Sequence, residues 1–243
     1  MPWKQIREIS FAGCGVLNFY QAGVCERLLE EIPFDNVVFS GASAGAGMSI
    51  VAALGIPPRA VVDSVMRELG QHPVGAKLRP AWAQAIGEGF IRDFLKPGDA
   101  QKLSGRVTIS ISRVQPISNL LVTEFRDDQD LQDALMASCH WPWFSRWTWS
   151  FRGLPCADGG LTNNQPAIFP DALRVSPFHW GQRGSIGPSR VIDPLNAFLV
   201  PSSKQVNRWL TLGRRDAETW LRHGAKPTPL ERLLPNPAQR FIA

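Results

Sequence analysis

Short apolar runs alternate with glycine-rich turns and amphipathic stretches along this chain. Residues 6–11 alternate and then become apolar, which predicts a first strand. Residues 18–32 place apolar side chains on one stripe at helical spacing. A second strand is predicted over 37–39, and a helix of small apolar residues follows from about 44 to 54. This order indicates parallel strands that are joined by crossover helices.

The alternation continues to the C-terminal part. It predicts further helices over about 59–70, 82–95, 131–138 and 204–222, and further strands over 106–112, 119–125, 173–178 and 191–200. Residues 71–100 are interrupted by prolines, and their helices could cover a functional site or pack against the sheet, of which we favour the second. We therefore predict a three-layer α/β/α sandwich with a mostly parallel central sheet and helices on both faces. It is a single domain over residues 1–243, with an irregular, proline-rich tail from about residue 224.

Composition limits the class of protein. The chain has 243 residues, of which 44% are hydrophobic, so it can bury one substantial core. Its start lacks the layout of a signal peptide, and no apolar run reaches the roughly eighteen residues of a membrane span. The four cysteines show no C-x-x-C spacing, which favours reduced thiols over disulfides or zinc. We expect a cytoplasmic protein, either soluble or peripheral on membranes or lipid droplets.

The positive charge is concentrated near the C-terminus. The formal net charge is +5, and residues 201–243 hold eight Lys and Arg against three Asp and Glu, which accounts for it. No dense basic face or known motif indicates binding to nucleic acid. A weak attraction to anionic lipid fits better, although an ordinary solvated face explains the charges equally well.

A candidate nucleophile lies between the second strand and its helix. The turn reads Gly41, Ala42, Ser43, Ala44, Gly45, which has the G-x-S-x-G form of a nucleophile elbow. The turn is so tight that only glycine or alanine fits beside the serine. The following helix aims its N-terminal N–H groups at the same point, where they can stabilise an oxyanion. The motif alone is not specific, because a glycine-rich turn before a closely packed helix has the same composition.

A second glycine-rich turn, Gly13-Cys14-Gly15, follows the first strand. Backbone N–H groups in such a turn bind an anion, either a dinucleotide pyrophosphate or the oxyanion of an acyl-transfer intermediate. The third glycine of a dinucleotide motif is replaced by Asn18, and the second strand ends in Ser40-Gly41 without an acidic residue. The oxyanion is therefore the favoured ligand. Adjacent parallel strands would bring this turn next to Ser43.

A carboxylate enters a third turn at Asp158-Gly159-Gly160, after the run Leu154–Ala157. On its own, this composition is typical of an ordinary tight turn. Four of the nine tryptophans lie just before it, within residues 141–149. We expect these tryptophans to pack in the interior or line an acyl pocket, with insertion into a membrane as the alternative.

Together, the three turns resemble a known family. The segments ISFAGCGVLNFYQAGV, FSGASAGAG and CADGGLTNNQP, with weaker matches in LRVSPF and LGRRDAETWL, are similar to the patatin-like phospholipases, in particular the branch of adipose triglyceride lipase. The matches keep the family's order and extend over nearly the whole chain. The resemblance implies a lipid acyl ester hydrolase that acts on phospholipid or acylglycerol and needs no metal or organic cofactor.

The resemblance also implies roles for individual residues. Ser43 would be the nucleophile and Asp158 the general base of a dyad without histidine. The Gly13–Gly15 loop and the Ala44 N–H would form the oxyanion hole. Asn18 departs from the family's last glycine, and we expect it to affect helix packing more than chemistry.

Two other hypotheses remain open. In a conventional triad, Ser43 and Asp158 would be joined by His179 or His223, which follow them in the chain order of α/β-hydrolases. In a non-catalytic protein, the same fold would bind lipid or act as a scaffold. If the dyad is correct, all four histidines, including His72 and His140, are dispensable.

Overall fold

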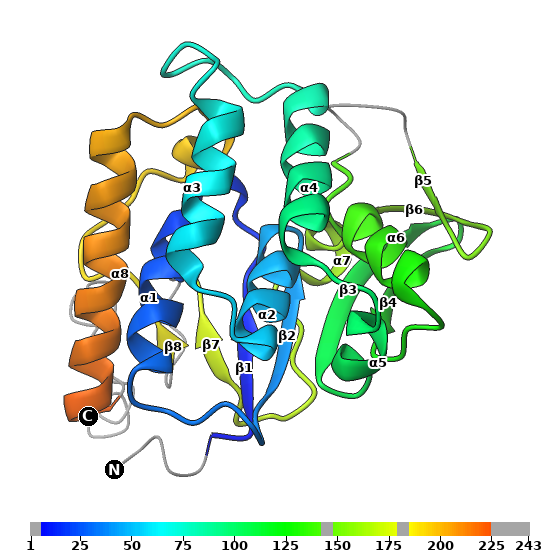
Figure 1. Cartoon of the computed structure of the whole chain (residues 1–243), viewed down its shortest axis with the longest axis horizontal. Coiled ribbons are helices and arrows are strands. Elements are labelled where there is room, and N and C mark those ends of the chain that lie inside the picture. Colours follow the sequence, from blue (N-terminus) through cyan, green and yellow to red (C-terminus); the bar gives the residue numbers. More distant parts are fainter. Residues whose placement is uncertain (1–5, 142–147, 179–184, 225–243) are drawn as a thin grey trace, which may run out of the picture.

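The computed structural model describes residues 6–141, 148–178 and 185–224, and in this part of the chain eight strands form one sheet (Figure 1). The strand order is β5-β6-β3-β2-β1-β7-β8, with β4 paired to β3. The strands are β1 (Glu8–Phe11), β2 (Val38–Ala42), β3 (Val107–Val114), β4 (Ile117–Val122), β5 (Trp149–Phe151), β6 (Leu154–Asp158), β7 (Leu173–Val175) and β8 (Ser185–Ile186).

Helices connect these strands. They are α1 (Asn18–Leu29), α2 (Ala44–Leu54), α3 (Pro58–Leu69), α4 (Pro80–Phe94), α5 (Asp99–Leu103), α6 (Asp128–Ser138), α7 (Gly160–Asn163) and α8 (Ser203–His223), with short 3₁₀ helices η2 (Gly15–Leu17) and η3 (Pro194–Phe198). None of the helices in these described segments is long and apolar enough to cross a membrane.

The sheet is parallel at one end and antiparallel at the other. Strands β3, β2, β1, β7 and β8 run parallel, whereas β4 and β6 pair antiparallel with β3, and β5 with β6. The pairing of Phe11 with Gly41 places the turns after β1 and β2 side by side. The pairing of Ile111 with Asp158 brings the end of β6 to the same edge from the opposite direction. The register therefore brings all three glycine-rich turns together.

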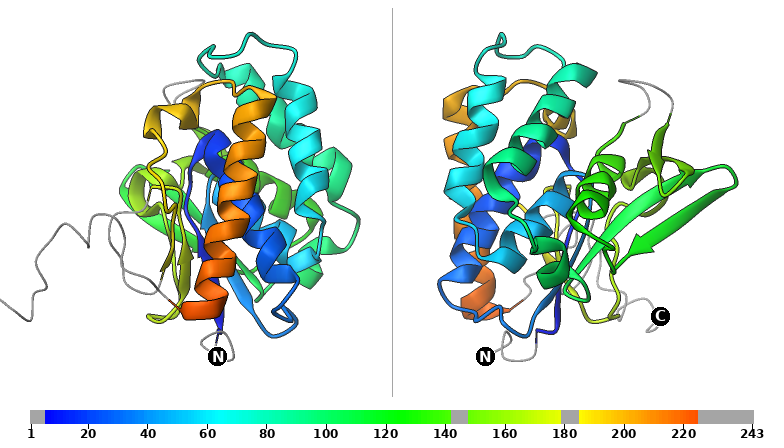
Figure 2. Two further views of the ribbon diagram at one scale, coloured as in Figure 1. Left: turned by 90° about the vertical axis from the view of Figure 1, so that its left-hand side faces the viewer. Right: turned by 45° about the vertical axis from the view of Figure 1, so that its right-hand side comes forward.

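One face of the sheet is apolar and carries the thick helical layer. Alternate strand residues such as Ile9, Phe39 and Ile109 are fully buried there. Helices α1, α2, α3 and α8 all lie on this side of the sheet (Figure 2), and α2 contacts β1, β2 and β3 directly. The small residues of α2 permit this close approach, because a Cβ on Gly45 would lie 2.3 Å from the Phe11 carbonyl oxygen.

The other face is polar and is covered by a thin layer. Ser40 Oγ donates to the Pro166 carbonyl (2.7 Å), and Ser110 Oγ donates to that of Asn163 (3.0 Å). The buried Glu8 carboxylate accepts hydrogen bonds from Ser40 Oγ and from the backbone N–H groups of residues 168 and 169. The segment from α7 to residue 170 is thus attached to the sheet by hydrogen bonds.

The predicted α/β/α fold class is confirmed, with three differences in detail. The second helical layer is, within the described residues, only α7 and the segment after it. Residues 191–200 do not form a strand, because Pro194 begins the 3₁₀ helix η3 and Asp193 caps it by accepting from the Leu195 N–H. Helix α4 packs on α3 and α6 rather than on the sheet, so the preferred prediction for residues 71–100 was wrong.

Replacing Glu8 tests how the thin layer is held. We expect Glu8→Ala to lower the free energy of unfolding by about 2–4 kcal/mol, because the N–H groups of residues 168 and 169 lose a charged acceptor and Ser40 Oγ keeps only the Pro166 carbonyl. Chemical denaturation measures the change. Asp63→Ala, at an exposed position of α3, is the control and should cost less than about 0.5 kcal/mol. Equal costs for the two variants would contradict this account.

Candidate active site

Ser43 occupies a strained turn between β2 and α2. Its backbone has φ 54° and ψ −129°, a conformation that residues with a side chain rarely adopt and that costs about 1–3 kcal/mol. The turn leaves no room at its flanks, since a Cβ on Gly41 would lie 2.3 Å from the Gly45 carbonyl oxygen. The sequence prediction of a tight elbow at Ser43 agrees with this geometry.

Ser138, the last residue of α6, fixes the elbow from the side. Its Oγ accepts a hydrogen bond from the Ser43 backbone N–H (2.8 Å) and donates one to the Ser110 carbonyl (2.7 Å). The side chain is fully buried, so this link is not exchanged with solvent. Sequence reasoning missed Ser138, because nothing local marks a serine that contacts the turn from 95 residues away.

Asp158 lies at the end of β6 with only 3% of its surface exposed. Its backbone N–H donates to the His140 carbonyl (2.8 Å), and its Oδ1 accepts from the Gly160 N–H (2.7 Å). Burial raises the pKa of the carboxyl group to about 6, against the opposing effect of hydrogen bonds from the Ser43 side chain and the Gly160 N–H. Asp158 is therefore a stronger base than an exposed aspartate, and the Ser43 side chain lies near enough to lower the pKa of its carboxyl group.

The loop after β1 lies against the elbow. A Cβ on Gly13 would come within 3.2 Å of the Ser43 Cβ. The Gly13 N–H donates to the Asn164 carbonyl (3.0 Å), so the prediction that it points into an oxyanion hole is corrected. The N–H groups of Cys14 and Gly15 have no acceptor among the described residues, and Ala44 N–H is in the first turn of α2, where helices leave donors free.

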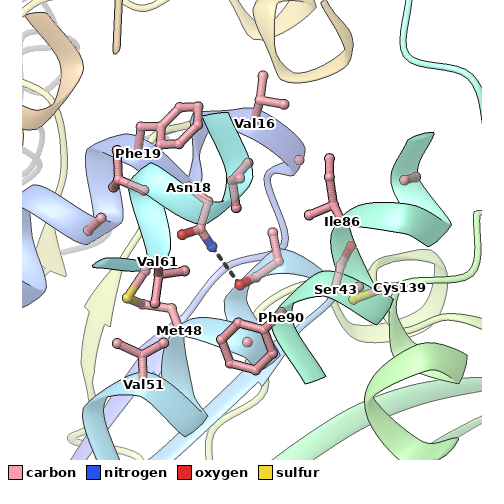
Figure 3. A pocket seen from close by; sticks show the side chains of 18 of the residues that line it. Val16, Asn18, Phe19, Ser43, Met48, Val51, Val61, Ile86, Phe90 and Cys139 are labelled. Atoms are coloured by element: carbon pink, nitrogen blue, oxygen red, sulfur yellow. Dashed lines mark hydrogen bonds between the residues drawn. The ribbon is translucent and has the colours of Figure 1, made fainter. Parts of the chain in front are cut away.

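Asn18 ties the first turn of α1 to the first turn of α2. Its Nδ2 donates to the Ala44 carbonyl oxygen (2.5 Å), the bond drawn in Figure 3, and more weakly to Gln21 Oε1 (3.4 Å). Asparagine at this position therefore connects the loop after β1 to the helix that follows Ser43. The sequence predicted an effect on helix packing but not this bond.

An apolar pocket opens beside Ser43 (Figure 3). It encloses about 950 Å³ including its mouth, within the range of pockets that hold small organic ligands. Helices α1, α2, α3 and α4 and the end of α6 line it, and Ser43 and Asn18 are the only hydroxyl and amide side chains among its described lining. The apolar lining is Val16, Phe19, Ala22, Met48, Val51, Val61, Val62, Val65, Leu78, Ala83, Ile86, Phe90 and Leu135. Residues 71–100 thus supply one wall of the pocket through Leu78 and α4.

Cys139 also borders the pocket, close to the Ser43 and Asp158 side chains. Burial and the nearby Asp158 carboxylate raise the pKa of its thiol far above the usual range. The thiol therefore stays protonated at neutral pH and is a poor nucleophile beside Ser43.

Two of the described histidine rings lie against tryptophan rings. His72 stacks on Trp82 (3.5 Å between ring centroids), and the His140 ring lies 5.6 Å from that of Trp149. His223 is exposed in the last turn of α8, and His179 lies outside the described residues. In the described segments, no three His, Cys, Asp or Glu side chains form a group that could hold a metal ion.

The tryptophan cluster is only partly described. Trp141 packs against Phe198, and Trp149 begins β5. Both are partly buried, and Trp149 packs against the hydrophobic core, which agrees with the packing part of the prediction. Neither lines the pocket, so the acyl-pocket part was wrong for these two. Trp143 and Trp147 lie outside the described residues.

Comparison with known proteins identifies the family of this fold. The family model for patatin-like phospholipases matches residues 9–170, which include all three glycine-rich turns. The chain belongs to the patatin-like phospholipase family. This confirms the resemblance inferred from the sequence motifs.

Several characterised relatives share this region. The human 1-acylglycerol-3-phosphate O-acyltransferase PNPLA3 is 35% identical over an alignment of 181 residues that covers 70% of this chain and 37% of that protein. The human omega-hydroxyceramide transacylase is 33% identical (70% of this chain, 34% of the relative), and the human patatin-like phospholipase domain-containing protein 2 is 30% identical (73% and 37%). The match thus spans little more than a third of each relative.

A solved structure shares the fold. VipD from Legionella pneumophila superposes with a TM-score of 0.59 at 12% identity and covers 92% of this chain and 68% of its own. This similarity concerns the fold alone.

The raised pKa of Asp158 has a consequence for stability. The folded protein holds the proton of the Asp158 carboxyl more tightly than the unfolded chain does. The free energy of unfolding therefore falls as the pH rises from about 4 to about 6, and above pH 6 the whole of this loss remains. We expect Asp158→Asn, which cannot ionise, to be more stable than the wild type at pH 8 by about 1–3 kcal/mol.

Urea denaturation of both proteins at pH 8 and pH 4.5 measures this difference, with the lower pH as the internal control. The advantage of Asp158→Asn should shrink at pH 4.5, where the wild-type carboxyl is largely protonated. An equal advantage at both values would show that charge burial is not its cause.

Proposed function

We propose that this chain is a lipid acyl ester hydrolase that uses Ser43 as nucleophile and Asp158 as general base. The observation that supports it best is the buried Asp158 carboxyl, with a pKa raised to about 6, beside a strained serine at an apolar pocket. A base that is ionised at neutral pH yet poorly solvated is suited to take a proton from a hydroxyl group.

The proposed reaction has two halves. Asp158 takes the proton of Ser43 Oγ as this oxygen bonds to the ester carbonyl carbon, and the carbonyl oxygen becomes an oxyanion that accepts from the N–H groups of Cys14, Gly15 and Ala44. The intermediate collapses, the C–O bond to the alcohol breaks, and the alcohol leaves with the proton from Asp158. Water then attacks the carbonyl carbon of the acyl-enzyme while Asp158 takes its proton. The bond between this carbon and Ser43 Oγ breaks, Ser43 Oγ recovers the proton from Asp158, and the carboxylic acid leaves.

The pocket supports an acyl chain as the group that is bound. Its lining is apolar from Val16 to Phe90, and a long chain gains roughly 0.8 kcal/mol for each buried CH₂ group. Phospholipid and triacylglycerol both carry such chains. Either substrate brings the protein to a lipid surface as a peripheral protein.

Acyl transfer to a lipid hydroxyl is a second candidate. Two of the relatives are named as an acyltransferase and a transacylase. The same acyl-enzyme serves both reactions, because an alcohol can replace water in the second half. The chemistry at Ser43 and Asp158 is unchanged between them.

Release of free fatty acid from phospholipid vesicles and from triacylglycerol emulsions tests the proposal. We expect Ser43→Ala and Asp158→Asn each to lower the rate by about 10³-fold or more, because each removes a member of one reacting unit. Products formed with added monoacylglycerol separate hydrolysis from acyl transfer.

The matched control is the double variant His179→Ala/His223→Ala, which should retain full activity. Loss of activity in this control would favour a triad with histidine. Activity that survives in Asp158→Asn would refute the role of Asp158.

A further inference from the structure

Exposed apolar and basic residues occur in the loop 71–79, in the segment 190–200 and in the first turns of α8. The loop 71–79 and the segment 190–200 lie at the same end of the molecule, beside the start of α8 (Figures 1 and 2). Val74 is 64% exposed and Leu195 is 70% exposed, although most large apolar side chains of the described residues are buried. Isolated apolar residues are ordinary on a surface, but here they accompany a concentration of charge.

The two segments that hold Val74 and Leu195 are rich in positive charge. Residues 71–79 and 190–208 contain the cations Lys77, Arg79, Arg190, Lys204 and Arg208, against one acidic residue. A groove on the outer side of α8 is lined by Arg190, Lys204, Asn207, Arg208, Thr211 and Arg215.

The basic side chains of this groove differ from the others of α8 in their partners. Arg214 on the inner side of α8 forms ion pairs with Glu26 (3.0 Å) and Glu30 (2.9 Å) of α1. Among the described residues, none of the four groove cations takes part in an ion pair. Their charges are therefore available to an external anion.

Backbone hydrogen bonds connect the loop 71–79 to the segment 190–200. Gly75 N–H donates to the Val200 carbonyl, Val200 N–H to that of Ala76 and Leu78 N–H to that of Phe198, all within 2.8–2.9 Å. Leu78 lines the pocket, so the loop that exposes Val74 also forms part of the pocket wall.

The segment 190–200 also touches the loop after β1. A Cβ on Gly15 would lie 2.2 Å from the Ala197 carbonyl oxygen, so η3 rests directly on the proposed oxyanion loop. The exposed Leu195 and the candidate oxyanion donors thus belong to neighbouring turns.

We propose that Val74, Leu195 and the cations Lys77, Arg190, Lys204 and Arg208 form a docking face for an anionic phospholipid surface. The apolar side chains enter the interface between headgroups and acyl chains, and the cations contact phosphate or carboxylate groups. A lipid surface fits better than an acidic protein, because the face adjoins an apolar pocket that, under the proposed function, must receive an acyl chain from a lipid layer.

Flotation with vesicles tests the docking face in the 243-residue chain carrying Ser43→Ala, so that hydrolysis does not change the lipid. We compare vesicles of phosphatidylcholine with vesicles that also contain phosphatidylserine. Binding is expected to the anionic vesicles and to weaken when ionic strength rises from about 0.1 to about 1 M, which shortens the Debye length from about 10 to about 3 Å.

Charge reversal identifies the residues. Lys204→Glu/Arg208→Glu should reduce partitioning to the anionic vesicles by about tenfold or more, since each cation at such a surface contributes about fivefold. The matched control is Lys96→Glu/Arg126→Glu, which changes the net charge equally at exposed positions of other segments and should bind within about twofold of the parent. Val74→Ser/Leu195→Ser should also weaken binding, and Ile117→Ser/Leu121→Ser on β4 should not.

Equal losses in the two charge variants, or no binding of the parent protein to anionic vesicles, would overturn the docking face. Thermal unfolding confirms that each variant is folded. Hydrolysis of a water-soluble short-chain ester, measured without lipid on the intact protein and on Lys204→Glu/Arg208→Glu, keeps the two proposals separate. Vesicle binding without esterase activity contradicts only the proposed function, and esterase activity without vesicle binding contradicts only the docking face.

Discussion

The positive φ of Ser43 is the constraint on which the site depends. A non-glycine residue at φ 54° persists only where its surroundings determine it. Here α2 rests against the end of β1 through Gly45, and Ser138 holds the Ser43 N–H from the end of α6. Strand β2, helix α2 and the end of α6 thus fix the backbone of Ser43 beside the pocket.

The segment after β6 joins the two other parts of the site. Gly160 N–H orients the Asp158 carboxylate, and four residues later the Asn164 carbonyl holds Gly13 N–H at the start of the oxyanion loop. Gln165 Nε2 then donates to the carbonyls of Ser10 and Val175, on β1 and β7. The short run from Asp158 to Gln165 therefore places the candidate base and the candidate oxyanion donors relative to each other. Hydrogen bonds attach this run to the polar face of the sheet.

The sequence was sufficient to predict those parts of the site where only one type of residue fits. Turns at Gly13, Gly41 and Gly159 admit no larger side chain, so their glycines mark the ends of β1, β2 and β6. Apolar runs were sufficient to predict β1 to β4, β7 and the longer helices, but not the short strands β5 and β8.

Contacts that depend on packing across the chain were not predictable in this way. The hydrogen bonds from Ser43 to Ser138 and from Asn18 to Ala44 join segments that are far apart in the sequence, and no local pattern indicates that these segments meet. The run 191–200 is apolar enough for a strand, but Asp193 and Pro194 favour a helical turn. Helix α4 has an apolar stripe that fits a sheet equally well, and only the packing of α3 and α6 shows that it faces the pocket.

The central claim is that Asp158 activates Ser43, and the rate at which a fluorophosphonate probe modifies Ser43 tests it most directly. Peptide mass spectrometry would locate the adduct, with the wild type and Asp158→Asn compared between pH 5 and pH 8, a range that spans the pKa of about 6. The account predicts labelling at Ser43 that rises through about pH 6 in the wild type and is strongly reduced at every pH in Asp158→Asn. Equal labelling of the two proteins, or no labelling of the wild type as expected of a protein that only binds lipid, would contradict it.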